Sequence, residues 1–328
     1  MTTSGGYTGA SVLVTGAQGF IGSWLTERLL EQGARVAVPR RAAAAESRFR
    51  REGLEERCDL LELDLLDLTA VVRALNEHQV GTVFHLAAQT IVGAASRSPF
   101  SSFEVNVRGT YTLLEACRLL ATDVRVVVAS SSYAYGRHPD SPLSEEVPLR
   151  SNQPYDVSKA CADMIARCYA ATYGMPVAVT RLANVYGGGD LNFSRLVPAA
   201  ARALVSGQRP VIHSDGTPER DYVYVEDAVD AYLAVAESLA RPALCGMAWN
   251  VGGDAPVSMA GVVQRLIRAA GHELEPDIRR RPTPGDEADR QHLDSAALRE
   301  RLGWKPKWSL DDGLRATYNW YERNHVAA

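Results

Sequence analysis

The sequence predicts an α/β protein: a doubly wound parallel sheet followed by a smaller C-terminal α/β substrate domain. Three observations support this prediction. Along the first half of the chain, short apolar and β-branched runs typical of buried strands alternate with helix-prone stretches. Three glycines at a spacing of three follow the first of these runs. Beyond Arg181 the strands become shorter and the alternation less regular, which indicates a second domain.

The first predicted strand, Ser11–Thr15, leads into Gly16, Gly19 and Gly22 and then into an amphipathic helix at Ser23–Glu31. A strand that turns into a helix through glycines leaves bare N–H groups at the helix N-terminus, which suit a pyrophosphate. The spacing G-x-x-G-x-x-G has one residue more than the usual dinucleotide fingerprint. Glycine trios also occur by chance in loops, but the flanking strand and helix favour a dinucleotide site.

The same alternation continues through the first domain. The further predicted strands are Ala34–Pro39, Cys58–Leu63, Thr82–Leu86, Arg125–Ser130 and Val177–Arg181. The further predicted helices are Ala42–Arg51, Asp67–Glu77, Pro99–Leu120 and Pro154–Tyr173. Such alternation requires parallel strands joined by right-handed crossovers, so ligands are expected in the loops that follow the strands.

The second half predicts a smaller domain with short strands. These strands are Val211–Ile212, Tyr222–Val225, Trp249–Val251 and Asp277–Arg280. Its predicted helices are Phe193–Ser206, Glu226–Leu239, Met259–Ala270, Ser295–Leu302 and Leu310–Arg323, with loops at Asn184–Asp190 and Arg279–Arg290. We therefore assign residues 1–181, plus about 225–251, to the dinucleotide-binding domain. Residues 182–224 and 252–328 form the substrate domain.

Composition excludes several classes of function. The 328 residues carry a net charge of −4, so no global attraction to nucleic acid or to an anionic membrane is expected. No apolar run is long enough to span a bilayer, and Met1–Ala10 is unlike a signal peptide. Five dispersed cysteines favour reduced thiols in a cytoplasm, and His78, His138, His272 and His292 show no metal-ligand spacing. We expect a cytoplasmic protein without a bound metal.

Tyr155 and Lys159 are the strongest candidates for chemistry. They lie four residues apart, hence one turn apart on one face of the helix Pro154–Tyr173. A nearby ammonium lowers the pKa of a phenol from about 10 towards neutrality, which suits Tyr155 to act as a general base or acid. Ser131 can offer a hydroxyl to the same oxygen. The alternative is a surface pair, yet Lys159 is the only lysine before Lys305.

Several motifs, in order, resemble the extended short-chain dehydrogenase/reductase superfamily. These are Thr15-Gly-x-x-Gly-x-x-Gly22, His85-Leu-Ala-Ala88, Asn106, Ser131 followed by Tyr135-Gly136, and Tyr155-x-x-x-Lys159. Within that superfamily, later motifs resemble the nucleotide-sugar epimerase/dehydratase group. These are Asn184, Arg195-Leu196, Gly216-Thr-x-x-Arg220-Asp-Tyr and Leu302-Gly-Trp-x-Pro306. The likeness runs from about Ser11 to Tyr321 and implies a Rossmann fold.

The resemblance implies bound NAD+ or NADP+. The residues that it assigns to the cofactor are Gly16, Gly19, Phe20, Ile21, Gly22, Arg40, Asp64, Leu65, Ala87, Ala88, Tyr155 and Lys159. Members that prefer NAD usually carry an acidic residue where this chain has Arg40, followed by Arg41. Two guanidinium groups suit a 2′-phosphate. Alternatively, Arg40 stacks on adenine or faces solvent while NAD+ binds, so both cofactors remain open.

The resemblance also implies a nucleoside-diphosphate sugar as the substrate. The residues that it assigns to the substrate are Ser131, Ser132, Tyr133, Asn184, Arg195, Leu196, Arg220 and Arg281. A forked guanidinium bridges phosphate oxygens well, which suits Arg195 and Arg220 to a diphosphate. Relatives pair the helices Pro99–Leu120 and Pro154–Tyr173 between subunits, so a homodimer is expected.

All enzymes of this group are expected to start alike, with Tyr155 removing the proton of the sugar 4-hydroxyl while hydride leaves C4. A 4,6-dehydratase then needs acid–base side chains just after Ser131, where this chain has Ser132 and Tyr133. The sequence therefore favours a nucleotide-sugar 4-epimerase, similar to UDP-glucose 4-epimerases.

A 4,6-dehydratase is the main alternative, because Gly285-Asp-Glu-Ala288 and Asn184–Asp190 resemble CDP-glucose 4,6-dehydratases. A 4-ketosugar reductase or a decarboxylase is less favoured. A non-catalytic dinucleotide sensor would have lost Tyr155 or Lys159, and both are present.

Overall fold

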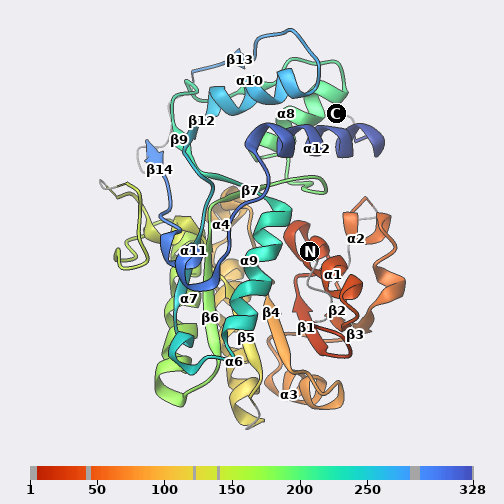
Figure 1. Ribbon diagram of the computed structural model, residues 1–328, viewed down its shortest axis with the longest axis vertical. Helices are drawn as coiled ribbons and strands as arrows, with labels where there is room; N and C mark the ends of the chain where they lie inside the picture. The colour runs from red at the N-terminus through yellow and green to blue at the C-terminus, as the bar shows by residue number, and fades with distance from the viewer. Residues whose placement is uncertain (1–5, 42–45, 121–122, 139–140, 281–288, 327–328) are drawn as a thin grey trace. The chain divides into compact units, whose positions relative to one another are not determined.

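The computed structural model describes residues 6–41, 46–120, 123–138, 141–280 and 289–326, which divide between two compact units (Figure 1). Unit 1 comprises Met1–Ala134, Ser151–Arg181 and Val229–Trp249. Unit 2 comprises Tyr135–Arg150, Leu182–Ala228 and Asn250–Ala328. The segment Tyr135–Arg150, placed in the first domain by the sequence, groups with unit 2. The binding roles expected of the two domains stay predictions.

Unit 1 is built on a seven-stranded sheet with the order β11-β6-β5-β4-β1-β2-β3 (Figure 1). The strands are β1 Ser11–Thr15, β2 Arg35–Pro39, β3 Asp59–Leu61, β4 Thr82–His85, β5 Arg125–Ala129, β6 Val177–Leu182 and β11 Ala248–Val251. The neighbours from β3 to β6 pair in parallel, and β1 lies between β2 and β4. The prediction of a doubly wound parallel sheet is confirmed. Its carboxyl edge is the expected place for ligands.

The helices of unit 1 follow the predicted order. They are α1 Phe20–Glu31, α2 Arg48–Arg51, α3 Leu68–Glu77, α4 Val92–Arg97, α5 Pro99–Phe103, α6 Gly109–Leu119 and α7 Pro154–Tyr173, with 3-10 turns at Glu55–Arg57, Ser132–Tyr135 and Pro242–Leu244. The sequence placed both ends of α7 correctly, because Pro154 opens it and Gly174, at φ 67°, ends it. Residues 42–45 of the predicted helix Ala42–Arg51 lie outside the described residues.

The long helix predicted at Pro99–Leu120 is not regular. A π-helical turn, Glu104–Arg108, separates α5 from α6, and the N–H of Gly109 donates to the carbonyl of Glu104 five residues back. A π turn inserted in a helix often marks a functional site. The side chain at its centre, Asn106, is buried.

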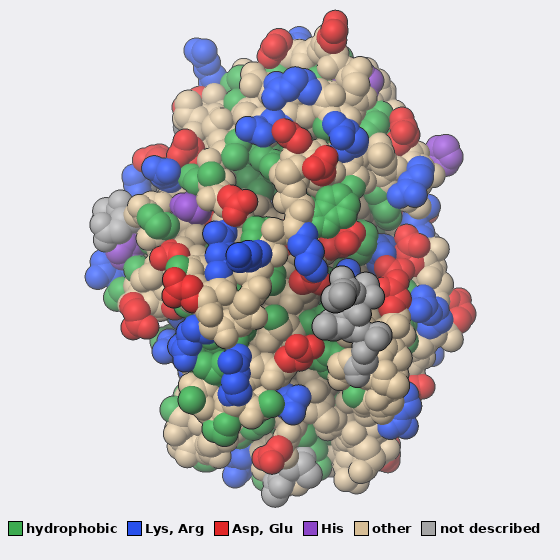
Figure 2. All heavy atoms as spheres, in the orientation of Figure 1, with side chains coloured by type: hydrophobic (Ala, Val, Ile, Leu, Met, Phe, Trp, Pro, Cys, Tyr) green, Lys and Arg blue, Asp and Glu red, His purple; other side chains and the backbone are tan. Residues whose placement is uncertain are grey.

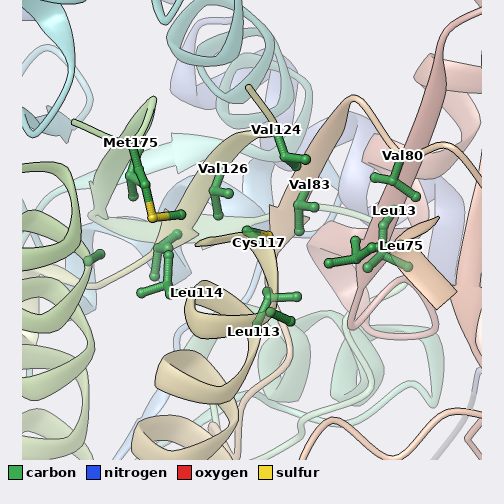
Figure 3. Close-up of a cluster of buried hydrophobic side chains, with 14 of the residues drawn as sticks. Leu13, Leu75, Val80, Val83, Leu113, Leu114, Cys117, Val124, Val126 and Met175 are labelled. Carbon is green, nitrogen blue, oxygen red and sulfur yellow. The ribbon is translucent and has the colours of Figure 1, made fainter. Parts of the chain in front are cut away.

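A hydrophobic cluster fixes the sheet of unit 1 against its helices (Figure 3). Leu13, Val83 and Val126, on β1, β4 and β5, meet Leu75 of α3 and Leu113 of α6. Each of these side chains is at most 1% exposed. Truncating such a residue to alanine typically costs about 2–5 kcal/mol. The cluster thus packs three neighbouring strands against α3 and α6.

Unit 2 consists of short strand pairs and packed helices. Its strands are β7 Asn184–Tyr186, β8 Val211–Ile212, β9 Glu219–Arg220, β10 Tyr222–Tyr224, β12 Val257–Ser258, β13 Asp277–Ile278 and β14 Arg290–Gln291. Its helices are α8 Leu196–Val205, α10 Met259–Ala269, α11 Ala296–Leu302 and α12 Leu310–Arg323, while α9 Val225–Ser238 continues into unit 1. Helices α8, α10 and α12 pack on one another (Figure 1).

Part of the predicted loop Asn184–Asp190 is a strand. Asn184, Val185 and Tyr186 pair in parallel with Tyr222–Tyr224. The glycines that follow these three residues suggested a loop throughout, and the partner strand lies far along the chain. The prediction was wrong for the first three residues, because tertiary pairing outweighs local composition.

The surface carries both signs of charge. On the face in Figure 2, acidic, basic and apolar side chains of the described residues are interspersed rather than gathered by sign. None of the described helices combines the length and the apolar character that crossing a membrane requires.

Candidate active site

The glycine turn after β1 is shaped by close backbone approaches. Gly16 has φ 77°, and a Cβ on it would lie 2.7 Å from the nitrogen of Ala87. A Cβ on Gly22 would lie 2.2 Å from the carbonyl oxygen of Gly16. Both positions therefore require glycine. Gly19 caps α1 without a side chain, so the first N–H groups of α1, including those of Phe20 and Ile21, have no side-chain partner from the cap.

This turn is a cradle that fits a dinucleotide. The missing side chains let the backbone of the turn pack tightly on itself and on Ala87, and the turn leads directly into the positive N-terminal end of α1. Because the fit comes from backbone geometry, it depends on the three glycines rather than on any charged side chain of the turn.

The ends of β2 and β3 carry the residues expected near adenosine. The Nε of Arg40 lies 2.7 Å from the Oε1 of Glu62, in a pair whose side chains are 51% and 82% exposed. The N–H of Arg41 donates to the side chain of Gln18 in the glycine turn. Asp64 accepts a hydrogen bond from the N–H of Leu66, while Leu65 is half-buried. Arg40 thus has an acidic partner here, which sequence reasoning missed.

The loop after β4 is held by side chains of unit 1. The N–H of Ala87 donates to the Oγ1 of Thr15 at 3.2 Å, and Ala88 is half-buried. Asn106, from the π turn, accepts a hydrogen bond from the N–H of Gln89 at 2.7 Å and donates to its carbonyl at 3.1 Å. The other hydrogen bond of the Asn106 amide goes to the Oγ of Ser158 on α7, at 2.8 Å. Asn106 therefore ties this loop to α7.

The structure brings Tyr155 and Tyr133 together within unit 1. Their rings lie 6.4 Å apart between centroids and cross at 69°, an edge-to-face contact. The N–H of Tyr133 donates to the Oγ of Ser131 at 3.2 Å. Ser131 and Ser132 are 7% and 2% exposed, whereas Tyr133 and Tyr155 are half-buried. Three of the predicted site residues thus lie in the turn after β5, beside the first turn of α7.

Lys159 is buried, and no carboxylate of the described residues forms an ion pair with it. Its side chain is 5% exposed, and its Nζ donates to the carbonyl of Ala129, at the end of β5, at 2.8 Å. The carbonyl of Lys159 accepts a hydrogen bond from Ser130. Burial lowers the pKa of the Lys159 ammonium to about 8.

A second ionisable group near Tyr155 was missed by sequence reasoning. Asp156 follows Tyr155 in the first turn of α7 and is 9% exposed, and its Oδ1 has no hydrogen-bond partner in the part of the chain that the structure describes. Burial raises the pKa of Asp156 to about 7. Its sequence signal was an acidic residue directly after the candidate base.

The substrate-binding candidates of unit 2 lie on three different elements. Asn184 begins β7, and its N–H donates to the carbonyl of Asp221. Arg195 precedes α8, where the half-buried Leu196 is the first residue, and its Nη1 lies 2.9 Å from the Oδ2 of the buried Asp190. Arg220, on β9, is only 4% exposed.

The remaining candidate, Arg281, and the motif Gly285–Ala288 lie outside the described residues. The same holds for most of the predicted loop Arg279–Arg290. Among the described residues, no group of three His, Cys, Asp or Glu side chains is arranged to hold a metal ion.

The model of the NAD dependent epimerase/dehydratase family matches residues 12–252, which include the glycine turn, the Ser131 turn and α7. The chain belongs to this family. The family is NAD-dependent, so the expectation of a nicotinamide cofactor is confirmed, and NAD+ is the cofactor that it supports.

Named relatives cover almost the whole chain. A UDP-glucose 4-epimerase of Mycolicibacterium smegmatis is 33% identical over 94% of this chain and 97% of its own length. A dTDP-glucose 4,6-dehydratase of Escherichia coli is 31% identical over 95% and 93%. A UDP-glucose 4-epimerase of Thermotoga maritima, solved with UDP-glucose, superposes with a TM-score of 0.86 at 29% identity, over 96% of this chain and 99% of that one. The protein is therefore an enzyme of the epimerase and dehydratase type.

Proposed function

We propose that this protein is a nucleotide-sugar 4-epimerase that uses bound NAD+ and a transient 4-keto sugar. The contact between Tyr133 and Tyr155 carries the proposal. It supplies an aromatic ring beside the candidate base, at a position where a dehydratase is expected to place an acid or a base.

The residues of unit 1 are suited to hold NAD+. The first N–H groups of α1 would donate hydrogen bonds to the pyrophosphate, and Gly16, Gly19 and Gly22 allow the tight backbone turn that precedes them. Asp64 and Leu65 flank the adenine, and the backbone of Ala87 and Ala88 supports the middle of the cofactor. Bound NAD+ would supply the acceptor for the hydride of the sugar C4 and the donor for its return.

Tyr155 is the proposed base. Its phenolate oxygen removes the proton of the 4-hydroxyl as the hydride leaves C4, and its phenol returns that proton when the hydride comes back. Lys159 keeps a positive charge near this oxygen while the proton is away. The oxygen of Ser131 accepts the N–H of Tyr133, and this leaves its hydroxyl hydrogen to donate to the sugar oxygen.

Return of hydride to the opposite face of the keto sugar inverts C4 and needs no further acid. A 4,6-dehydratase must in addition remove the C5 proton and protonate the leaving C6 hydroxyl. Ser132 is buried, and neither a serine hydroxyl nor a phenol without a neighbouring ammonium is a strong general acid. These two positions therefore support epimerisation better than elimination.

In unit 2, we propose that Arg195 and Arg220 bind the diphosphate, together with Asn184 and Leu196. The Asp190 carboxylate holds one nitrogen of Arg195 in place. A planar guanidinium held by one edge can present its other edge to phosphate oxygens.

The second candidate function, a 4,6-dehydratase, is favoured by the 31% identity to the Escherichia coli enzyme. Incubating the enzyme and NAD+ with UDP-, CDP-, GDP- and dTDP-hexoses in heavy water separates the two. NMR should show the C4 epimer of one of these sugars, without deuterium at C5. Deuterium at C5 with loss of the 6-hydroxyl would establish dehydration instead, and no conversion of any sugar would contradict both functions.

We also propose a cytoplasmic homodimer. Helices α6 and α7 pack on each other and leave large apolar side chains exposed nearby, including Phe100 at 75%, Tyr111 at 42% and Met164 at 54%. Five free cysteines support a reducing compartment. Phe100→Glu should convert the dimer to a monomer in sedimentation equilibrium, and an unchanged mass would exclude this surface.

A further inference from the structure

A buried chain of polar groups runs through unit 1 between the loop after β4 and α7. His85, the last residue of β4, is 3% exposed, and both of its ring nitrogens lie within hydrogen-bond distance of a threonine hydroxyl. Nδ1 is 2.8 Å from the Oγ1 of Thr15, and Nε2 is 3.0 Å from the Oγ1 of Thr110. Such a histidine has a definite tautomer, which its neighbours decide.

The hydrogen bonds on the Thr110 side assign the proton. A hydroxyl carries one hydrogen, and Thr110 donates its own to the carbonyl of Asn106 at 2.6 Å. Thr110 can therefore only accept from His85, so Nε2 carries the hydrogen. Nδ1 must then accept, and Thr15 donates to it.

The hydrogen bonds at both ends of this series of polar groups are consistent with that assignment. The oxygen of Thr15, having donated its hydrogen, accepts the N–H of Ala87 at 3.2 Å. Beyond Thr110, Asn106 donates from its side chain to Ser158, whose hydroxyl donates to the carbonyl of Tyr155 at 2.6 Å. In this order every hydrogen is used once and no two donors face each other.

We propose that His85 is a positioning residue, which as the neutral tautomer protonated on Nε2 fixes the loop Ala87–Gln89 and the Tyr155 turn of α7 relative to each other. Burial, together with the nearby charge of Lys159, lowers the pKa of His85 to about 3, which keeps the ring neutral. A protonated ring would offer two donors, and the bond from Thr15 would be lost.

The two nitrogens of His85 can be tested separately. Asparagine places its oxygen near the position of Nδ1, so His85→Asn keeps the acceptor for Thr15 and loses the donor to Thr110. Glutamine places its amide nitrogen near Nε2, so His85→Gln keeps the donor and loses the acceptor. Thr110→Val removes the hydroxyl that faces Nε2, and Thr15→Val removes the hydroxyl that faces Nδ1.

We expect variants on the two sides of His85 to change different quantities, kcat on the Thr110 side and the Kd of NAD+ on the Thr15 side. Only the kcat measurement rests on the proposed function. Cutting the Thr110 side, with His85→Asn or Thr110→Val, should lower kcat about 10-fold and change the Kd of NAD+ less than about 2-fold. Cutting the Thr15 side, with His85→Gln or Thr15→Val, should raise that Kd about 10-fold. Thr112→Val, a buried threonine of α6 outside this chain, is the matched control.

A direct measurement accompanies the variants. In ¹⁵N-histidine-labelled protein at pH 7, the resonance lost in His85→Asn should be that of a neutral ring protonated on Nε2. A proton on Nδ1, or changes of kcat and Kd by equal factors in all four variants, would overturn the proposal. If no nucleotide sugar is turned over, the proposed function fails, but the tautomer and the pattern of NAD+ affinities still decide the role of His85.

Discussion

Helix α7 buries two opposite charges one turn apart, Lys159 and Asp163, and their hydrogen-bond partners differ in charge. Asp163, at 0% exposure, receives two hydrogen bonds from the buried guanidinium of Arg181, at 2.8 and 3.0 Å. Lys159, at 5% exposure, donates to the carbonyl of Ala129 and has no carboxylate partner among the described residues. The first arrangement is a closed ion pair, and the second leaves a positive charge available.

The difference indicates that the Asp163–Arg181 pair serves stability, whereas Lys159 is placed for catalysis. A buried pair with matched geometry recovers most of the cost of desolvating its two charges. A buried ammonium that faces only a carbonyl does not, and the pKa of Lys159, lowered to about 8, reflects this cost. Residues kept in costly environments concentrate at functional sites. Lys159 fits that pattern because it lies one turn from the proposed base, Tyr155.

Breaking the closed pair should give the largest effect on stability. Asp163→Ala leaves the Arg181 guanidinium buried without its partner, so the free energy of unfolding should fall by about 3–5 kcal/mol. Urea denaturation at pH 7 measures this change. The double variant Asp163→Leu with Arg181→Met removes both charges and should recover most of the loss. A double variant as unstable as the single one would show that the pair itself, and not the orphaned charge, determines stability.

Tyr155→Phe tests the catalytic role proposed for Tyr155 and its neighbour Lys159. Losing the phenolic oxygen should lower kcat by about 100-fold or more, because the proton of the 4-hydroxyl then has no acceptor. The affinity for NAD+ and the unfolding midpoint should stay close to those of the parent. If Lys159 acts through Tyr155, adding Lys159→Met to Tyr155→Phe should lower kcat little further. Additive losses would mean that Lys159 acts independently, and unchanged turnover in Tyr155→Phe would refute its assignment as the base.

Local signals explain why much of this could be predicted from sequence. The glycine turn, both ends of α7 and the spacing of Tyr155 and Lys159 depend on neighbouring residues alone. The first strand and α7 formed where they were expected, whereas α1 begins at Phe20, before the predicted start at Ser23. The π turn around Asn106 was not predictable, since that side chain bonds to Gln89 and Ser158 from other parts of the chain.

The same limit applies to charges in the site. Sequence spacing placed Lys159 on the face of Tyr155, but the partner of its ammonium, the carbonyl of Ala129, follows from how β5 meets α7. The direction of hydrogen bonding through His85 likewise requires Thr15 and Thr110, which have no local signal. The role of Tyr155 as a base remains a prediction.

Replacing the unpaired ammonium should stabilise the fold while impairing catalysis. Lys159→Met keeps a long apolar side chain and removes a buried charge, so the free energy of unfolding at pH 7 should rise by about 1–3 kcal/mol. The folded-state pKa of about 8 lies below the unfolded value of about 10.4, so the parent gains stability from this group as pH rises between these values. The advantage of Lys159→Met should therefore shrink between pH 7 and pH 10. A constant difference across this range would contradict the lowered pKa.

The exposed pair of Arg40 and Glu62 is the surface counterpart of the buried pair, and breaking it should have the smallest effect. With side chains 51% and 82% exposed, the pair should contribute less than about 0.5 kcal/mol to stability, so Glu62→Gln should leave the unfolding midpoint almost unchanged.

The Arg40–Glu62 pair should instead affect the choice of cofactor, because Glu62 competes with any 2′-phosphate for the Arg40 guanidinium. Parent enzyme should prefer NADH, and Glu62→Gln should improve NADPH affinity relative to NADH by about 3- to 5-fold, roughly the 1 kcal/mol expected for an exposed charged contact. Fluorescence titration of both cofactors measures the ratio, with Arg40→Ala in the Glu62→Gln background as the control that should reverse the gain. A ratio that Glu62→Gln leaves unchanged would place Arg40 outside the reach of the adenosine ribose.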